Sequence, residues 1–313
     1  MISMIYSSDT IDGVCAAACI VRGLRIKGFP ARFAGTLSPE TPDSVKDLID
    51  QANCALLIVD YPPENIPNLP EVLKKIVSKA TLAYWNFTQP QQPETLALLG
   101  VVKRVDYAEV RLGSVQRATS TELVASRFIA GDPVGKQLAN LAADIKFWLR
   151  QDDRATKLAD LLVSGFDKRT IVDSLSKGIV WDDKFEAARN EYLEKKTKAL
   201  EDLMKRLTIK EILGKRYGFT IAPALLRTAD AGQYILDKHA GVDVSVALYR
   251  SGKIAFRSRE GTDVDLSNLA KQFQGGGRKY ASGGLFSEQP ITVENWENVL
   301  GALDRKLKTY FLS

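Results

Sequence analysis

Histidine is almost missing from this chain, which has a single one, His239, in 313 residues. A catalytic metal centre that depends on several histidine ligands is therefore excluded. The three cysteines form no Cys-x-x-Cys pair, and Cys15 and Cys19 share one helical face, a spacing that favours core packing over metal binding. No apolar run approaches the roughly 18 residues of a membrane span, and the N-terminus has no signal-peptide pattern. We expect a cytoplasmic protein with reduced thiols and no membrane partner.

The composition is that of an ordinary globular protein, with 45% hydrophobic and 26% charged residues. The formal net charge of +5 permits a nucleic-acid or acidic protein partner without requiring one. A length of 313 residues exceeds what one hydrophobic core usually serves, so we expect two domains.

Strands and helices alternate in the first third of the chain, which predicts an α/β fold with a parallel sheet. Residues 1–6 form a short apolar strand, and residues 14–24 have an apolar helical pattern. The run over residues 55–59 is continuously apolar and ends in Asp60, as a buried parallel strand does. The carboxyl ends of such strands are where open α/β sheets bind ligands. A further helix and strand are expected over residues 72–78 and 80–84.

A helical region follows. Residues 120–129 and 133–150 have apolar side chains at helical spacing. Residues 184–215 are rich in both lysine and glutamate, and Glu191 and Lys195 are spaced to pair along one helical turn. We interpret this region as a solvated connecting helix, because mixed charges usually solvate a helix surface; a DNA-binding face is the alternative.

The pattern changes again after Gly218, where strand-like runs over residues 219–226 and 242–249 precede a hairpin and a short helix. These elements predict a smaller α+β domain. The expected division is an α/β domain over residues 1–165, a helical connector over residues 166–217 and an α+β domain over residues 218–313.

A glycine-rich loop near the C-terminus is the first candidate site. Consecutive glycines permit positive φ angles and close approach to a ligand, and successive backbone N–H groups can bind an anion. Two arginines lie on the preceding hairpin and two cations follow the glycines, a pattern suited to phosphate-backbone recognition. A plain tight turn is the alternative. The candidate residues are Arg257, Arg259, Gly275, Gly276, Gly277, Arg278 and Lys279.

Two aspartates form the second candidate site. Asp12 precedes Gly13 at a strand-to-helix turn, and Asp60 follows the buried strand. A carboxylate at either position could satisfy free N–H groups at a helix start or a turn. Both also lie where the edge of a parallel sheet is expected to bind ligands.

The sequence resembles a known family in both regions. Residues 256–284 read FRSREGTDVDLSNLAKQFQGGGRKYASGG, which resembles the DHHA1 domain of the DHH/DHHA1 phosphoesterases, the RecJ-like group, along its whole length. Residues 8–13 and Asp60 are similar to the first two motifs of the accompanying DHH domain. The resemblance implies a parallel-sheet DHH-like domain joined by a helical connector to a smaller DHHA1-like domain.

The family's two-metal centre uses an HxDxDG motif, a second-strand aspartate and a DHH triplet. The resemblance places Ser8 at the histidine and Thr10 at the first aspartate, so that only Asp12 and Asp60 remain. The third strand ends in Tyr-Trp-Asn-Phe in place of Asp-His-His, and Trp85 is expected to intrude on the site. Two carboxylates without histidine hold two metal ions poorly. We therefore expect no catalytic residue and no cofactor; one weakly bound Mg²⁺ between the aspartates is the alternative.

The resemblance also bears on the loop and on function. Histidine usually occupies the position of Arg278, so a permanent cation replaces a titratable group there. Family members with broken motifs include the inactive RecJ-like subunit of the CMG replicative helicase, and this chain looks most like the archaeal version. The resemblance implies a non-catalytic replication factor that associates with GINS and MCM and binds single-stranded DNA weakly. The alternatives are an active metal-dependent exonuclease or oligonucleotide phosphodiesterase with a rearranged site, and a sensor of a small nucleotide.

Overall fold

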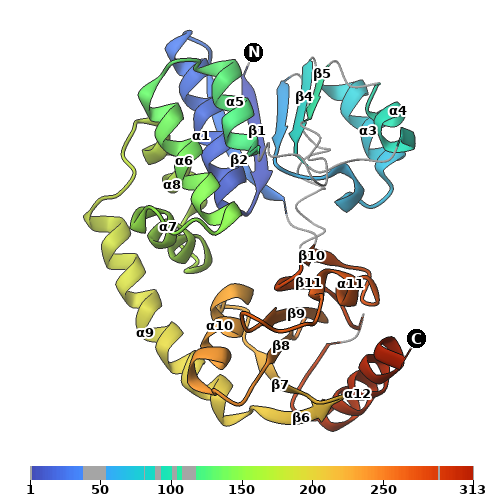
Figure 1. Cartoon of the computed structure of the whole chain (residues 1–313). Coiled ribbons are helices and arrows are strands. Elements are labelled where there is room, and N and C mark those ends of the chain that lie inside the picture. The colour runs from blue at the N-terminus through green and yellow to red at the C-terminus, as the bar shows by residue number, and fades with distance from the viewer. Residues whose placement is uncertain are drawn as a thin grey trace. The chain divides into compact units, whose positions relative to one another are not determined.

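The computed structural model describes residues 2–37, 54–80, 82–88, 93–100, 104–107, 118–287 and 290–312. The chain divides into two compact units, Met1–Arg189 and Asn190–Ser313. Figure 1 shows the first unit in blue to green and the second in yellow to red. Among the described residues, no helix has the length and apolar character needed to cross a membrane.

A five-stranded parallel sheet in the order β2-β1-β3-β4-β5 forms the centre of the first unit. On β3, Leu57 and Val59 face one core cluster while Leu56 and Ile58 face another. This alternation shows a sheet buried on both faces, as a continuous apolar run predicts. The expected α/β class is confirmed. The strands are Ser3–Ser8 (β1), Ala31–Leu37 (β2), Ala55–Val59 (β3), Leu82–Phe87 (β4) and Arg104–Tyr107 (β5).

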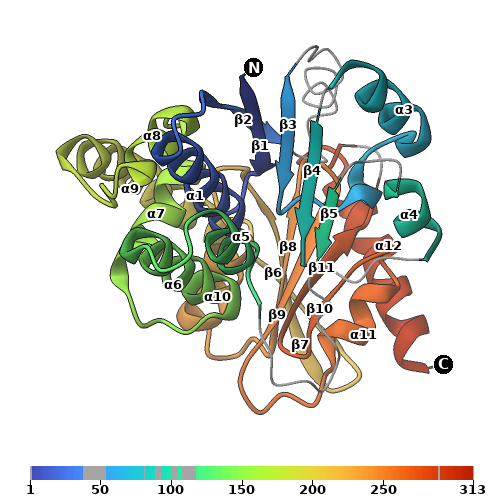
Figure 2. The same cartoon turned by 90° about the horizontal axis from the view of Figure 1, so that it is seen from above.

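Helices cover both faces of this sheet (Figure 2). On one face lie α1 (Ile11–Ile26), α5 (Ser120–Phe128), α6 (Pro133–Phe147), α7 (Asp153–Val163) and α8 (Lys168–Ser176). On the other lie α3 (Leu69–Lys79) and α4 (Pro93–Leu99), preceded by a short 3-10 turn, η1 (Pro63–Asn65).

Helix α1 is buried on nearly every side. The side chain of Thr10 caps its start by accepting a hydrogen bond from the N–H of Gly13 at 3.0 Å. Alanines at positions 16–18 and the thiols of Cys15 and Cys19 are fully buried. Such small side chains let the sheet and helices α5, α6 and α8 approach α1 closely. The expectation that both cysteines are free core residues is confirmed.

The boundary between the units lies inside helix α9 (Asp183–Lys205), whereas the sequence pattern placed a separate connector over residues 166–217. Ile171 on α8 and Phe185 on α9 are buried in the core of the first unit, and Leu203 is buried in the second. The helices of this region are charged on their exposed faces, but each also has a narrow apolar face. That apolar face packs in the core of the unit to which it belongs.

The second unit contains a six-stranded mixed sheet in the order β10-β11-β9-β8-β7-β6, which gives the expected α+β domain. Only β7 and β8 pair in parallel, connected through α10; the other pairs are antiparallel. The strands are Thr208–Ile212 (β6), Lys215–Ala222 (β7), Val244–Tyr249 (β8), Lys253–Ser258 (β9), Gly276–Arg278 (β10) and Ala281–Leu285 (β11). The helices are α10 (Thr228–Lys238), α11 (Leu266–Lys271) and α12 (Trp296–Leu312).

Strand β6 contradicts the expectation of a helix that continues to residue 215. Residues 208–212 alternate partly buried and exposed side chains, and they pair with β7 through a two-residue turn. Leu213 and Gly214 have φ angles of +48° and +74°. Such turns usually carry Asn-Gly, so Leu-Gly gives a weak hairpin signal and the surrounding charges favoured the helix interpretation.

Two helical glycines give matched predictions for stability. A Cβ at Gly23 on α1 would lie 2.7 Å from the carbonyl oxygen of Phe128 and 3.0 Å from its Cβ. We expect Gly23→Ala to lower the free energy of unfolding by about 1–3 kcal/mol, because α5 must shift.

Gly301 on α12 is the control, since the nearest atom to its added Cβ is 3.8 Å away. Gly301→Ala should raise stability by up to about 1 kcal/mol through helix propensity. Urea denaturation measures the free energy of unfolding of both variants. If both substitutions changed it by the same amount in the same direction, close packing at Gly23 would not be the cause.

Candidate functional sites: a carboxylate centre and a glycine-rich hairpin

The first site lies at the carboxyl edge of the parallel sheet, where strands β1 and β3 end beside the starts of α1 and α5. We call it the carboxylate centre. It brings together the four motif positions Ser8, Thr10, Asp12 and Asp60, as the family resemblance implies. The structure adds four residues that sequence reasoning missed: Thr88, Ser120, Thr121 and Lys146.

Asp12 is only 4% exposed, and both oxygens of its carboxylate are engaged. Oδ1 accepts hydrogen bonds from the N–H and the hydroxyl of Thr121, each at 2.8 Å. Oδ2 accepts from the N–H of Ser120 at 3.0 Å and from the ammonium of Lys146 at 2.6 Å. A carboxylate offers about four acceptor positions, so these donors fill it. Asp12 thus caps α5 rather than its own helix, with the added benefit of the helix dipole.

Asp60 follows β3 with a left-handed φ of +53°, a conformation that aspartate tolerates better than most residues. The hydroxyls of Ser8 and Thr10, each at 2.7 Å, donate to its Oδ2. The hydroxyl of Ser120 donates to Oδ1 at 2.8 Å. The hydroxyls of Ser8 and Thr10, which the family resemblance sets at metal-ligand positions, are therefore hydrogen-bond donors to the carboxylate of Asp60.

Lys146 supplies the positive charge of the centre from the last turn of α6. Its Nζ lies 2.6 Å from Oδ2 of Asp12 and 3.9 Å from Oδ1 of Asp60, and it donates to the hydroxyl of Thr88 at 2.7 Å. In sequence, Lys146 resembles any cation near a helix C-terminus, where the dipole favours it. Nothing in the local pattern marks its contact with a residue 134 positions earlier.

The ammonium of Lys146 lies near the carboxylates of both Asp12 and Asp60, so one positive charge faces two carboxyl groups. This arrangement affects the pKa of Asp60. Desolvation, together with the nearby charge of Asp12, raises the pKa of Asp60 from 3.8 to about 6, against the opposing effect of Lys146 and the two hydroxyls. Below about pH 6, the carboxyl of Asp60 therefore holds a proton that a solvent-exposed aspartate would have released.

The end of β4 differs from the expectation. Trp85 does not enter the carboxylate centre; it is buried in the core on the α3 face, and its indole N–H donates to the carbonyl of Tyr61 at 2.8 Å. Alternate residues of a strand face opposite sides, so Tyr84 packs in the α1-side core instead. Asn86 is fully buried, and neither polar atom of its side chain has a hydrogen-bond partner among the described residues.

The residues of the carboxylate centre do not fit the family's two-metal site. A metal centre needs ligand atoms free to coordinate, but those of Asp12 are filled by donors, and an ammonium lies between the two aspartates. Within the described ranges, no group of three or more aspartate, glutamate, histidine or cysteine side chains is placed to hold a metal ion.

The second site is the glycine-rich hairpin of β10 and β11, in which Lys279 and Tyr280 form the turn. Close packing explains most of its glycines. A Cβ at Gly277 would lie 2.6 Å from the carbonyl of Ala281, and one at Gly275 would collide with the backbone of Gly283. The N–H of Gly275 also donates to the carbonyl of Ala270, so it is not free to bind an anion. Only Gly276 faces open space.

Gly276 also lines a cleft of about 410 Å³ beside the start of α10. Its lining includes Gly276, Gly277, Arg257 and Thr228, the first residue of α10. The guanidinium of Arg257 donates to the side-chain oxygen of Gln233 at 2.8 Å, which fixes it near the cleft. Lys279 is exposed and Arg278 half-buried, both at the hairpin tip.

Arg259 does not join the other predicted residues. Its guanidinium donates to the carbonyls of Leu236, His239 and Val242, at 2.6–3.3 Å. These carbonyls belong to the end of α10 and the loop after it, so Arg259 acts as a helix C-terminal cation. Its alternation with Arg257 along the sequence gave no sign of this role.

We predict that Lys146 and Asp12 depend on each other for stability. Lys146→Met leaves buried carboxylates without their cation and should lower the free energy of unfolding by about 2–3 kcal/mol. Asp12→Asn in that background should cost much less than in the wild type, giving a coupling of at least about 1 kcal/mol.

Urea denaturation of the four proteins of this double-mutant cycle measures the coupling. Lys136→Met, an exposed change on the same helix, is the control and should stay within roughly 0.5 kcal/mol of the wild type. Additive effects of the two substitutions would disprove the ion pair as an energetic unit.

Asp60 gives a pH-dependent prediction. Between pH 4 and 6 the folded protein keeps a proton on Asp60 that the unfolded chain has already released, because its pKa is raised to about 6. Its contribution to stability therefore falls as pH rises through this window. The difference in unfolding free energy between the wild type and Asp60→Asn should fall by roughly 1–3 kcal/mol from pH 4 to pH 7. Parallel pH curves for the two proteins would show that this aspartate titrates normally.

Comparison with known proteins supports the two-unit architecture. No protein-family model and no curated protein sequence matches the chain. Solved structures do match it. RecJ from Thermus thermophilus, in complex with Mn²⁺, superposes with a TM-score of 0.60 at 12% identity, covering 99% of this chain and 52% of that one. The chain thus spans about half the length of that RecJ.

Two other matches extend over nearly the whole of both chains. CDC45 from Entamoeba histolytica gives a TM-score of 0.55 at 8% identity, over 97% of this chain and 95% of that one. The pGpG-specific phosphodiesterase PggH from Vibrio cholerae gives 0.51 at 11% identity, over 98% and 99%. Identities this low establish the fold alone. The chain has the two-unit fold of the RecJ-like DHH/DHHA1 proteins.

Proposed function

We propose that this protein is a non-catalytic RecJ-like replication factor. The observation that carries the proposal is the ammonium of Lys146, which lies 2.6 Å from Asp12 and 3.9 Å from Asp60. Two-metal hydrolysis of a phosphodiester needs divalent ions at these carboxylates to activate water and neutralise the developing charge. A tethered ammonium balances the resting charge of the centre, but it cannot activate a water molecule as a Lewis acid does.

A role in replication is supported by the fold. The fold matches CDC45 from Entamoeba histolytica over 97% of this chain and 95% of that one. The sequence resemblance to the inactive subunit of the CMG helicase then suggests GINS and MCM as its partners.

Weak binding of single-stranded DNA is the second part of the proposal. Arg257, Gly276 and the start of α10 border a cleft large enough for a phosphate and its sugar, and Arg278 and Lys279 add positive charge at the hairpin tip. Backbone N–H groups and cations of this kind hold phosphates without reading bases. A strand bound there would pass uncut if the carboxylate centre is inert.

One observation favours the alternative of a retained ligand or activity. Asn86 is a buried amide with no partner among the described residues, and buried polar groups nearly always have one. A water molecule or a polar ligand atom beside β4 would satisfy it. PggH, with a similar fold, is a pGpG-specific phosphodiesterase, so a dinucleotide is the natural ligand to test.

The deciding experiment incubates the purified protein with labelled single-stranded DNA, RNA and pGpG in the presence of Mn²⁺ or Mg²⁺. We expect no cleavage above the level of Asp12→Ala, because no metal-activated water forms at the centre. Mn²⁺ should also leave the melting temperature unchanged, since a ligand that binds the folded state would raise it. Cleavage that disappears in Asp12→Ala would establish an unusual nuclease and refute the proposal.

The same DNA serves for a binding measurement. The double variant Arg278→Glu/Lys279→Glu should bind more weakly, and the slope of log K against log salt should become shallower by about 0.7 for each lost phosphate contact. Arg206→Glu/Arg250→Glu, with the same change in charge elsewhere on the second unit, is the control. Equal losses in both variants would show a general charge effect rather than a site at the hairpin.

A further inference from the structure

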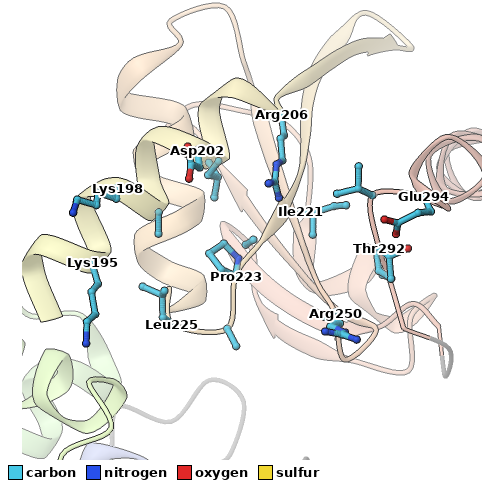
Figure 3. Close-up of a pocket in the computed structure, with 16 residues that line it drawn as sticks. Lys195, Lys198, Asp202, Arg206, Ile221, Pro223, Leu225, Arg250, Thr292 and Glu294 are labelled. Atoms are coloured by element: carbon cyan, nitrogen blue, oxygen red, sulfur yellow. The ribbon is translucent and has the colours of Figure 1, made fainter.

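A second surface of the same unit remains unexplained by these roles. An open groove of about 820 Å³ runs between the last turns of α9, the segment that follows β7 and the segment that precedes α12 (Figure 3). We call it the α9 groove. It shares no lining residue with the cleft beside the glycine-rich hairpin. Its role does not depend on whether the carboxylate centre hydrolyses anything.

The floor of the α9 groove is aliphatic. Leu203 and Ile291 are buried beneath it, while Pro223, Ala224 and Val293 are exposed along it. Val293 is the most exposed of the large apolar side chains beside the groove, at 61%. Contiguous apolar surface of this kind, bordered by charge, is characteristic of binding sites on soluble proteins.

The rim of the groove has an excess of positive charge. Lys198, Arg206 and Arg250 are exposed. Arg206 and Arg250 lie close enough to Asp202 and Glu294 to help lower the pKa of those carboxyls. With Lys195 and Lys198, four cations of the lining face two carboxylates. Figure 3 shows Arg206 and Arg250 on different sides of Pro223. The carboxylates of the rim are already engaged. Asp202 pairs with Lys205 at 2.8 Å, and a hydrogen bond from Thr292 lowers the pKa of Glu294.

We propose that the α9 groove binds an acidic amphipathic helix of a partner protein. The aliphatic floor would take the apolar face of such a helix, and the three cations of the rim would meet its flanking carboxylates. From Lys195 to Arg206 the rim of α9 extends for about 16 Å at 1.5 Å per residue, the length of three helical turns. The mixed charges of α9, which suggested a solvated connector, here form one wall of a binding surface.

The lining argues for protein over nucleic acid. It contains no aromatic side chain among the described residues, so unpaired bases would find no stacking surface. A groove for single-stranded DNA would need aromatic side chains along its lining.

The test is an unbiased selection of 16-residue peptides, displayed as a random library, on the full-length protein. Enriched sequences should combine aliphatic residues at spacings of three and four with an excess of aspartate and glutamate. Synthetic peptides of those sequences should bind at least tenfold more weakly to Arg206→Glu/Arg250→Glu. Val293→Asp should weaken them too, because it places a charge on the apolar floor. All the altered side chains are exposed, and unchanged melting temperatures would show that the variants fold.

Arg278→Glu/Lys279→Glu carries the same charge change at the hairpin tip and should bind the peptides like the wild type. The proposal is overturned if no acidic–aliphatic sequence is enriched or if the peptides bind both charge-reversed proteins equally. It is also overturned if a labelled dT20 oligonucleotide, rather than the peptides, loses binding in Arg206→Glu/Arg250→Glu. None of these results bears on the cleavage assay, so this proposal and the proposed lack of hydrolysis fail independently.

Discussion

The ion pair between Lys146 and Asp12 is the interaction on which the edge of the parallel sheet depends. Two carboxylates lie close together there with little exposure, an arrangement that costs several kcal/mol unless each charge is compensated. The ammonium, the N-terminal amides of α5 and the hydroxyls of Ser8 and Thr10 supply that compensation. Because these donors come from β1, α1, α5 and α6, one electrostatic requirement fixes the positions of four elements.

The sequence predicts the parts of this centre that lie near each other along the chain. Asp12 follows a strand at a helix start, and Asp60 ends a continuous apolar run; both patterns are local. Lys146 could not be predicted, because its role exists only after α6 has packed beside α1. Arg259 was expected to bind phosphate. In the fold, its guanidinium instead donates to the carbonyls at the end of α10, a contact that its neighbours in the sequence do not indicate. The fold class and the most apolar strands follow from local periodicity, whereas the charge partners follow from packing.

The two units differ in how their polar groups are arranged. In the first unit, Ser8, Thr10, Asp12 and Asp60 stabilise the fold, since each is a donor or an acceptor in one hydrogen-bond network. The second unit carries the surfaces with unsatisfied potential for binding: the cleft at Gly276 and the α9 groove.

A cation that is covalently part of the chain has no dissociation equilibrium. The positive charge of Lys146 therefore stays in place at any concentration of free Mn²⁺ or Mg²⁺, and chelating agents cannot remove it. A metal centre would make the stability of this sheet edge vary with the ion supply of the cell. With the lysine, the architecture of the sheet edge is independent of metal availability.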